Sequence, residues 1–302
     1  MQTHLLLCDI GNTTLKIGVA DEKRVLTSYC LPVQNEETAD SFGFTLLSLL
    51  THARVAPDSI LAAAISSVVP RMDSLVREAV SRYLDCPALF APHDLPIPLE
   101  NRYDRPEEVG ADRLVGAFAA RRLFPAPQSL IVVDYGTAVT FDCVSGQAYL
   151  GGLIFPGPAT AVAALAANTS RLPTVNLDIR AQEPAPCRDT ATSIRHGLVF
   201  GFVCVTEGLV KRLKDQMSAP TKVLATGGFS QAIARLSTVF DAVLPALILP
   251  RENGGETVLG IVTSCAGVAT LIGSLVVTVL PAPKNRVRVI YVTMLISLGT
   301  EN

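Results

Sequence analysis

The amino-acid sequence predicts an α/β protein built from two copies of one unit, in which three strands are followed by a helix, a strand and a helix. Its 302 residues are long enough for two domains, and 49% hydrophobic content is ample for two cores. Two stretches, CDIGNTTLKIGV at residues 8–19 and VVDYGTAVTFDCV at residues 132–144, end an apolar run with aspartate and then turn through glycine. Similar elements surround both stretches, so we interpret the chain as an internal duplication.

The first half begins with three predicted strands. Residues 5–10, 15–20 and 24–31 carry the apolar patterns of strands, and Gly11 with Asn12 marks a tight turn between the first two. We therefore expect a meander, in which each strand lies beside the next.

The rest of the first half alternates helices and strands. One helix is the clearest, because its apolar residues recur at the three-and-four spacing of a single face: Met72, Leu75, Val76, Ala79, Val80, Tyr83 and Leu84. In chain order we predict a helix near residues 42–50, a buried strand at 60–69 ending at Pro70, this helix over 72–84, a short strand at 88–90, a proline-rich loop at 92–106 and a helix over about 113–123.

The meander returns after a proline-rich break at residues 125–127. The predicted elements there are strands at 129–135, 138–144 and 147–154, helices at 159–168 and about 190–217, a strand at 222–225, a helix after Gly228 and a strand at 243–249. We expect an N-terminal lobe at 1–122, a C-terminal lobe at 123–250 and a divergent apolar tail at 251–302. Two similar lobes facing one another predict a central cleft.

Composition excludes several classes of protein. The formal net charge is -2 and no long run of Lys or Arg is present, which argues against a surface that grips nucleic acid through its phosphates. The seven cysteines include no CxxC pair, so we expect reduced, buried thiols rather than a disulfide framework or a zinc site. No basic leader or cleavage site precedes the first strand, so a cytoplasmic protein is predicted.

The repeated turn has chemistry suited to phosphate. Exposed backbone N–H groups form an anion-binding concavity, Thr13, Thr14 and Thr137 can donate hydrogen bonds, and Asp9 and Asp134 can hold a cation that offsets phosphate charge. Either motif alone is more readily explained as an ordinary Asp/Gly hairpin turn. Two copies, each opening one half of a duplicated chain, favour a nucleotide clamp.

Six segments carry a resemblance to a known family. They are DIGNTTLK (residues 9–16), AISSVVP (64–70), NRYDRPEEVGADR (101–113), VDYGTAVTFD (133–142), GGLIFPG (151–157) and ATGGFS (225–230). In this order, over about four-fifths of the chain, the sequence resembles the actin-like (ribonuclease H-like) ATPase superfold and, within it, is similar to type III pantothenate kinase. The resemblance implies ATP-dependent phosphorylation of pantothenate to 4'-phosphopantothenate, the first step of coenzyme A biosynthesis.

The resemblance assigns Asp112, in the GADR segment, as the catalytic residue. Phosphorylation of an alcohol needs a carboxylate that takes the hydroxyl proton as the new bond to phosphorus forms. The alternative for Asp112 is a helix N-cap, because it lies where the proline-rich loop meets a predicted helix.

Further roles follow from the resemblance. Nucleotide binding with Mg²⁺ is implied for Asp9, Gly11, Asn12, Thr13, Thr14, Lys16, Thr137, Gly227 and Gly228. Pantothenate binding is implied for Tyr103, Gly110, Ala111, Arg113 and Thr190, the last across a homodimer interface. A monovalent cation, potassium or ammonium, is implied at Asp134.

Each of these roles has a plainer alternative. Arg113 is either a partner for the pantothenate carboxylate or a solubilising helix residue, Tyr103 either lines the pocket or packs under its loop, and Thr190 either binds substrate or caps a helix. The alternative for Asp134 is an ordinary aspartate of a turn, without a bound cation. The four histidines, at positions 4, 52, 93 and 196, form no recognisable triad or metal cluster.

The sequence departs from the family pattern at Val139, Asp189 and Thr192, where members commonly have Thr, Asn and Glu. The larger departure is the tail, which has no charged residue over 257–283, a length that meets the threshold of about 20 residues for a membrane span. A packed helix and strand, or a stretch outside the ancestral reading frame, are the alternatives, and membrane contact is not favoured because Ser, Thr, Gly and Cys interrupt the run.

Two other function classes stay open at this stage. One is a non-catalytic, nucleotide-binding transcriptional accessory factor of the same family. The other is an actin-like phosphatase or a kinase for another substrate. Retention of Asp9, Asp112, Arg113 and Asp134 counts against the first.

Overall fold

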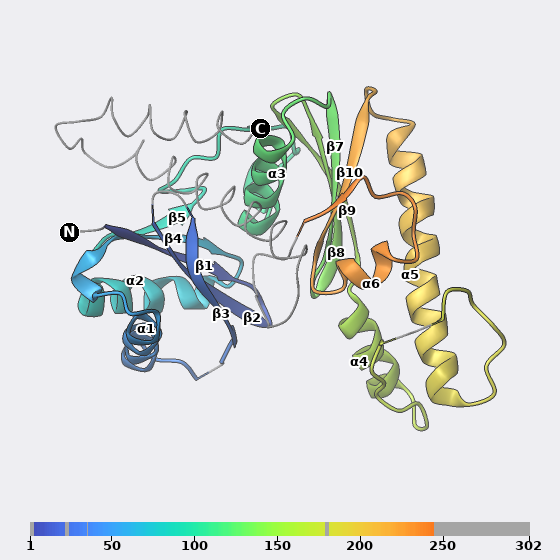
Figure 1. Ribbon diagram of the computed structural model, residues 1–302, viewed down its shortest axis with the longest axis horizontal. Coiled ribbons are helices and arrows are strands. Elements are labelled where there is room, and N and C mark those ends of the chain that lie inside the picture. Colours follow the sequence, from blue (N-terminus) through green and yellow to red (C-terminus); the bar gives the residue numbers. More distant parts are fainter. Residues whose placement is uncertain (1–2, 22–23, 35, 179–180, 245–302) are drawn as a thin grey trace. The chain divides into compact units, whose positions relative to one another are not determined.

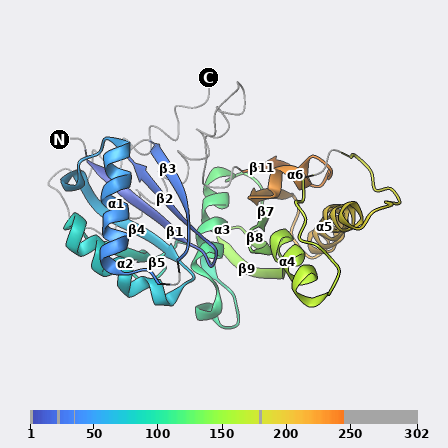
Figure 2. The ribbon, with the colours of Figure 1, turned by 90° about the horizontal axis from the view of Figure 1, so that it is seen from below.

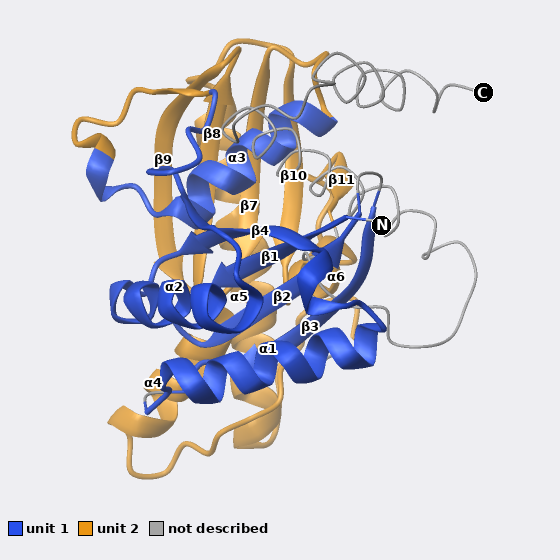
Figure 3. Cartoon of the chain, turned by 90° about the vertical axis from the view of Figure 1, so that its left-hand side faces the viewer, with its two compact units in different colours: residues 1–98, 107–123, 247–302 blue, residues 99–106, 124–246 orange. Residues whose placement is uncertain are grey.

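The structure is a computed structural model, and it describes residues 3–21, 24–34, 36–178 and 181–244 (Figure 1). The predicted tail at 251–302 lies outside the described residues. The chain divides into two compact units, one with residues 1–98 and 107–123 and the other with 99–106 and 124–246, where these are described (Figure 3). The boundaries predicted from sequence, 1–122 and 123–250, remain a prediction.

The first unit contains a five-stranded sheet with the order β3-β2-β1-β4-β5. β1 is antiparallel to β2 and parallel to β4, β2 is antiparallel to β3, and β4 is parallel to β5. The strands are β1 His4–Ile10, β2 Thr14–Ala20, β3 Val25–Pro32, β4 Ile60–Ser67 and β5 Ala88–Ala91.

Two helices, α1 Ala39–Ala53 and α2 Pro70–Leu84, lie on the same side of this sheet (Figures 1 and 2). A capping box between Thr38 and Ser41 starts α1, and Pro70 at the first position starts α2. Their apolar faces pack with one face of the strands in a core that includes Ile17, Phe42, Leu46, Ile65 and Val76. Burial of this stripe is the main reason that the predicted helices form.

The second unit contains a six-stranded sheet with the order β11-β10-β7-β8-β9-β6. β7 is antiparallel to β8 and parallel to β10, β8 is antiparallel to β9, and β10 is parallel to β11. The strands are β6 Glu100–Asn101, β7 Ser129–Tyr135, β8 Ala138–Ser145, β9 Ala148–Pro156, β10 Thr221–Gly227 and β11 Ala242–Val243.

The two sheets repeat one topology. Reading from β3 to β5 and from β9 to β11 gives the same order, with the same parallel and antiparallel neighbours. The predicted α/β class with duplicated actin-like units is therefore confirmed. β6 is an addition to the second sheet, where it pairs in parallel with β9. The predicted cleft concerns how the units face each other and stays a prediction.

Three helices contribute to the core of the second unit. They are α4 Pro158–Asn168, α5 Thr190–Lys214 and α6 Ser230–Ala234. Val162, Phe202 and Ile233, one from each helix, share a core with Val133 and Phe141 of the sheet. Among the described helices, α5 alone is long and apolar enough to cross a membrane by length and composition, and seven of its residues, including Phe202 and Val210, are buried.

Several element boundaries differ from those predicted. The loop predicted at 92–106 contains β6, and a short 3-10 helix, Pro106–Glu108, begins at its last residue. α3 spans Ala111–Leu123 and so begins two residues before the predicted start at 113. α5 ends at Lys214 rather than near 217, because the following N–H groups make tighter turn bonds such as Gln216 N to Leu213 O at 3.0 Å. Of the strand predicted at 243–249, the described residues show only Ala242–Val243.

The prediction that the cysteines are buried is only partly right. Six cysteines lie in the described residues and all are free thiols. Cys8 and Cys143 are buried, whereas Cys30 and Cys204 are exposed. The apolar pattern of a strand or helix does not by itself tell which side of the element faces the core.

Candidate functional site

The hairpin of β1 and β2 carries the first predicted motif. Asp9 is the register partner of Lys16, and the Lys16 ammonium lies 3.4 Å from an Asp9 carboxylate oxygen. Both side chains are about one-third exposed. The first hairpin therefore presents a carboxylate that already has a cationic partner from its own unit.

The turn of this hairpin is tight and open to solvent. Gly11 N–H donates to Thr14 O at 3.0 Å, and a β-carbon at Gly11 would lie 3.2 Å from that oxygen. Asn12, Thr13 and Thr14 are exposed. The turn is therefore open to an anion beside the Lys16 charge.

Ser66 lies next to this hairpin and was not among the site residues predicted from the sequence. It is the register partner of Asp9 on the parallel strand β4, and its hydroxyl is buried with no hydrogen-bond partner in the part of the chain that the structure describes. Its neighbour Ser67 differs, since it donates to Asp73 at 2.6 Å. The signal in the sequence was the pair of serines that ends a buried strand in AISSVVP.

The hairpin of β7 and β8 carries the second motif. Its turn, at Gly136 and Thr137, is exposed and closes with a bond from Gly136 N–H to Ala138 O at 3.1 Å. Gly157 N–H donates to Thr137 O at 3.0 Å, and a β-carbon at Gly157 would overlap that backbone. The Thr160 hydroxyl donates to the same oxygen at 2.6 Å. The GGLIFPG segment thus holds the turn in place.

Asp134 precedes this turn and lies against the end of β10. It is the register partner of Thr226, and Gly227 is the partner of Tyr135. A β-carbon at Gly227 would overlap an Asp134 carboxylate oxygen, and Gly227 has a φ of +92°. Gly227 is therefore needed for both its backbone conformation and its lack of a side chain. Gly228 is exposed, with open space where a β-carbon would be.

A buried carboxylate that was not among the predicted site residues lies on the same strand pair. Asp142 is 3% exposed and accepts hydrogen bonds from Tyr149 at 2.8 Å and from Thr140 at 2.9 Å. Thr140 is the register partner of Asp134. An aspartate inside an otherwise apolar strand, VTFDCV, was the available signal, because burial of a carboxylate requires partners.

Gly110 and Asp112 lie together at the start of α3. Asp112 is exposed, and one of its oxygens lies 2.5 Å from the position of a β-carbon at Gly110 and accepts from Arg113 N–H at 2.8 Å. Gly110 O accepts from Arg113 N–H and Leu114 N–H. The helix therefore begins at Ala111, so the N-cap alternative for Asp112 is wrong: Asp112 is the second helical residue, where the helix dipole favours a carboxylate.

Tyr103 belongs to the second unit in the structure. Its ring packs on Gly151, whose β-carbon would lie 3.1 Å from the ring, and Gly151 has a φ of +101°. The Tyr103 N–H donates to Asn101 Oδ1 at 3.1 Å. The packing alternative describes what the ring does here, and its predicted contact with substrate stays a prediction.

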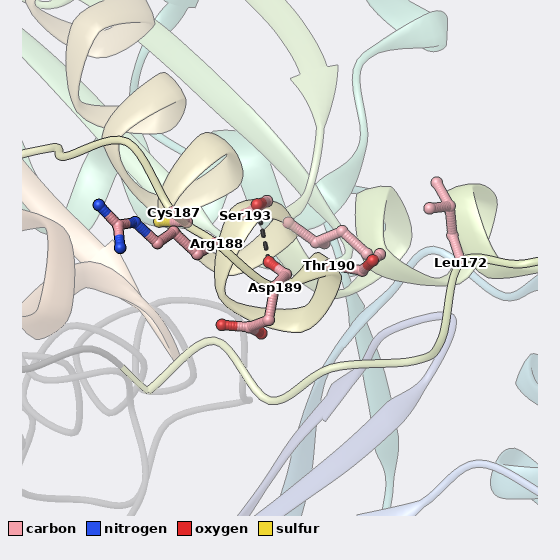
Figure 4. A pocket seen from close by; sticks show the side chains of 7 residues that line it. Leu172, Cys187, Arg188, Asp189, Thr190 and Ser193 are labelled. Atoms are coloured by element: carbon pink, nitrogen blue, oxygen red, sulfur yellow. Dashed lines mark hydrogen bonds between the residues drawn. The ribbon is translucent and has the colours of Figure 1, made fainter.

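Thr190 lies at the start of α5, in a pocket of about 550 Å³ (Figure 4). The cap of this helix is Asp189, whose side chain accepts from Thr192 N–H at 2.9 Å, so the N-cap alternative for Thr190 is wrong. The Asp189 backbone oxygen accepts from the Ser193 hydroxyl at 2.7 Å. The pocket is lined by Leu172, Cys187, Arg188, Asp189, Thr190, Ser193 and Ile194.

The structure thus groups the predicted residues into local sets within each unit. The first unit brings Asp9 to Lys16 and Gly110 to Asp112, and the second brings Asp134 to Gly227. The Thr190 pocket contains none of the hairpin residues. Among the described residues, no three His, Cys, Asp or Glu side chains form a cluster that could hold a metal ion by themselves.

Comparisons with known proteins agree on one family. The family profile described as type III pantothenate kinase matches residues 5–212. A type III pantothenate kinase of Desulfovibrio desulfuricans is 62% identical over 249 residues, which cover 82% of this chain and 95% of the relative. One from Oleidesulfovibrio alaskensis is 56% identical with the same coverage.

A solved structure described as a conserved putative Baf family transcriptional activator from Campylobacter jejuni aligns with 20% identity and a TM-score of 0.48. The alignment covers 79% of this chain and 89% of that one. This similarity is too low to bear on function.

Proposed function

Because the chain belongs to the type III pantothenate kinase family, we propose that it transfers the γ-phosphoryl group of ATP to the primary hydroxyl of pantothenate. The products are ADP and 4'-phosphopantothenate, and the reaction is the first step of coenzyme A biosynthesis. The family match over residues 5–212 carries this conclusion. The site residues, the cation and the assembly are the finer parts of the proposal.

Asp112 is the proposed proton acceptor. In the in-line reaction the pantothenate hydroxyl oxygen bonds to the γ-phosphorus, the bond from that phosphorus to the bridging oxygen of ADP breaks, and the hydroxyl proton passes to a carboxylate. Asp112 supports this role because it is exposed at the start of α3 and is held against Gly110. Positioning of that carboxylate, rather than covalent chemistry, is its contribution.

The two hairpins are proposed to hold the nucleotide. On the first, the Lys16 ammonium, the Gly11 backbone and the exposed turn hydroxyls form a donor set that suits phosphate. On the second, Thr137 and the Gly227 backbone have the same suitability, and Gly228 has open space above its α-carbon. The nucleotide-binding set is Asp9, Gly11, Asn12, Thr13, Thr14, Lys16, Thr137, Gly227 and Gly228.

The chain also fits the metal ions that this chemistry implies. A magnesium ion typically uses one or two carboxylates together with water and phosphate oxygens, so the lack of a three-residue cluster among the described side chains is compatible with it. When bound, the cation offsets phosphate charge. Asp9 is the proposed contact for that ion, and Asp134 is the proposed ligand for potassium or ammonium.

The acceptor pocket is proposed to include Tyr103, Gly110, Ala111, Arg113 and Thr190. Arg113 is assigned to the pantothenate carboxylate, because a planar guanidinium pairs with carboxylates in two parallel hydrogen bonds. Thr190 is exposed in the open pocket at the start of α5, which supports completion of the pocket by a second copy of the chain. We propose a cytoplasmic homodimer that does not bind nucleic acid, and membrane contact through the tail is not favoured.

A coupled assay of ADP release tests this proposal. Purified enzyme is given ATP and magnesium, with or without pantothenate, in parallel salts of potassium, ammonium and sodium. We expect ADP release that requires pantothenate and is faster in potassium or ammonium than in sodium. Equal ADP release without pantothenate would rule out a pantothenate kinase. Equal rates in all three salts would contradict the proposed requirement for potassium or ammonium.

A further inference from the structure

A row of three side chains crosses the first sheet near the end of β1. Asp9 is the register partner of Lys16 on β2 and of Ser66 on β4. Neighbouring strands lie about 5 Å apart, and register partners project from the same face of a sheet. The Asp9 carboxylate therefore has an ammonium beside it on one strand and a hydroxyl beside it on the other.

Of these two neighbours, Lys16 pairs with Asp9 and Ser66 does not. The Lys16 ammonium lies 3.4 Å from an Asp9 carboxylate oxygen. The Ser66 hydroxyl is buried and has no hydrogen-bond partner among the described residues. The charge of Lys16 thus holds the carboxylate on the β2 side, and the proton of Ser66 has no acceptor.

A buried hydroxyl without a partner is costly. Its removal from water costs free energy that a hydrogen bond would return, so native proteins keep few such groups, and those that they keep are often functional. The backbone at Ser66 is fixed, because the Val68 N–H donates to Ile10 O at 3.0 Å and so continues the ladder between β4 and β1 beyond Ser66. The hydroxyl therefore gains an acceptor by motion of a side chain, and the carboxylate of Asp9 is the acceptor beside it.

The second unit repeats this arrangement of an aspartate and a hydroxyl. The two sheets share one strand order, in which β1 is equivalent to β7 and β4 is equivalent to β10. The register partner of Asp134 on β10 is Thr226. Each unit thus has a hydroxyl residue beside its aspartate on the parallel strand, although the surrounding residues differ, with ISSV in one unit and ATGG in the other.

Resting on the proposed nucleotide site at the first hairpin, where Lys16 binds phosphate and Asp9 contacts the magnesium ion, we infer that Ser66 is a positioning residue of Asp9. When Lys16 turns toward the phosphates, its charge no longer holds the carboxylate on the β2 side. The Ser66 hydroxyl then donates to Asp9 and keeps the carboxylate oriented toward the cation. Ser66 acts through Asp9 and not on the nucleotide, because its own oxygen is buried.

Ser66→Ala separates this role from a merely structural one. The ligand-free variant should unfold at the wild-type temperature or above it, since it loses a buried hydroxyl that has no partner among the described residues. With ATP and no pantothenate, the variant should need about tenfold more magnesium, or a larger excess, for half of the rise in unfolding temperature. This is the usual effect of losing a residue that orients a metal-binding carboxylate.

Two further substitutions test the hydroxyl itself. Ser66→Thr copies the residue of the second unit and keeps the hydroxyl, whereas Ser66→Val has nearly the same shape without it. We expect wild-type magnesium dependence for Ser66→Thr and the weaker binding of Ser66→Ala for Ser66→Val. Ser67→Ala is the matched control on the same strand, because it removes a hydrogen bond to Asp73 of 2.6 Å. It should lower the unfolding temperature of the ligand-free enzyme and leave the magnesium dependence unchanged.

The outcomes distinguish this inference from the proposed function. Ser66→Ala with wild-type magnesium dependence, or with a lowered unfolding temperature when ligand-free, overturns the role of Ser66. If Asp9→Asn raises the magnesium requirement and Ser66→Ala does not, the contact at Asp9 stands and only the role of Ser66 falls. Wild-type magnesium dependence in Asp9→Asn overturns both. In either case, pantothenate-dependent ADP release by the wild-type enzyme would leave the kinase assignment standing.

Discussion

The carboxylate of Asp134 lies against the α-carbon of Gly227, so that a β-carbon at Gly227 would overlap one of its oxygens. The contact joins the turn of one strand pair to the end of the neighbouring parallel strand. Gly227 also has a φ of +92°, a conformation that side chains disfavour. Two separate requirements therefore exclude every other residue at this position.

Gly227→Ala is expected to displace Asp134 and to strain the backbone. Strain of this kind typically costs about 1–3 kcal/mol of unfolding free energy, and a displaced binding group can lower activity by about 100-fold. Denaturant unfolding and the ADP assay measure the two effects. Gly208→Ala is the control, because Gly208 is exposed in a helix and none of the described atoms beyond its neighbours and the helix backbone lies within 4 Å of an added β-carbon; this variant is expected to gain up to about 1 kcal/mol. Equal behaviour of the two variants would contradict this account.

Gly110→Ala is expected to disturb the proton acceptor directly. The new β-carbon would lie 2.5 Å from an Asp112 oxygen and 3.3 Å from a Val68 methyl group, so the carboxylate must move. We expect turnover to fall by about 100-fold, with the ATP-dependent rise in unfolding temperature retained. Gly116→Ala, farther along α3 with nothing within 4 Å, provides the comparison. A Gly110→Ala enzyme with wild-type turnover would show that Asp112 does not depend on this contact.

The cysteines are expected to differ in reactivity with iodoacetamide. Burial, followed by the charge of Asp9, raises the pKa of Cys8 to about 12, so its thiolate is scarce near neutral pH. Cys30 and Cys204 are exposed. Mass spectrometry of the native enzyme should find alkylation at Cys30 and Cys204 before Cys8 and Cys143, and of the unfolded enzyme at all four. Labelling of Cys8 as fast as Cys204 would contradict the buried position of β1.

Asp94 is expected to make stability depend on acidic pH. Its pKa is lowered from the ordinary 3.8, first by the Phe90 N–H and then by Arg77, whose nitrogen lies 3.1 Å away. A depressed folded pKa means that the contribution is present above pH 3.8 and is lost as pH falls through the folded pKa. Asp94→Asn should therefore lower the unfolding temperature at neutral pH, and the difference from wild type should shrink in acid.

The control for Asp94 is Glu107→Gln, which removes a carboxylate from an exposed position. A difference between Asp94→Asn and wild type that stays constant from neutral pH into acid would show that the hydrogen bonds, rather than the charge, carry the effect.

The repeated fold was predictable because the periodic signals in this chain are strong. The strands predicted at 129–135 and 138–144 are rich in apolar residues that are buried in the structure, and Val133 and Phe141 share a core with helices. The predicted helix over 72–84 needed only two more residues at its start, where Pro70 takes the first helical position. In each case the local sequence signal predicts the same element that burial of its apolar face stabilises.

The errors arose where local rules compete or where partners are distant in sequence. Asp112 and Thr190 are both residue types that often cap helices, and both lie beside a helix start. The residue that precedes the first helical position is Gly110 for α3 and Asp189 for α5. This position depends on backbone geometry that composition does not specify. β6 is two residues long and exists because it pairs with β9 about 50 residues away. Such pairings carry no local periodicity.

The motifs of the candidate site could be predicted from the sequence, but the residues that lie beside them in the sheets could not. Asp9 and Asp134 follow from the repeated turn, but Ser66, Thr140 and Asp142 become candidates only when strand registers are known. Register depends on the whole buried face of a sheet.

The central claim is that Asp112 takes the proton of a pantothenate hydroxyl, and the most direct test is the turnover of Asp112→Asn in the ADP assay. We expect wild-type enzyme to release ADP only with pantothenate, and Asp112→Asn to lose turnover on the order of 100-fold or more while ATP still raises its unfolding temperature. Wild-type turnover in Asp112→Asn, or ADP release that is indifferent to pantothenate, would contradict the account.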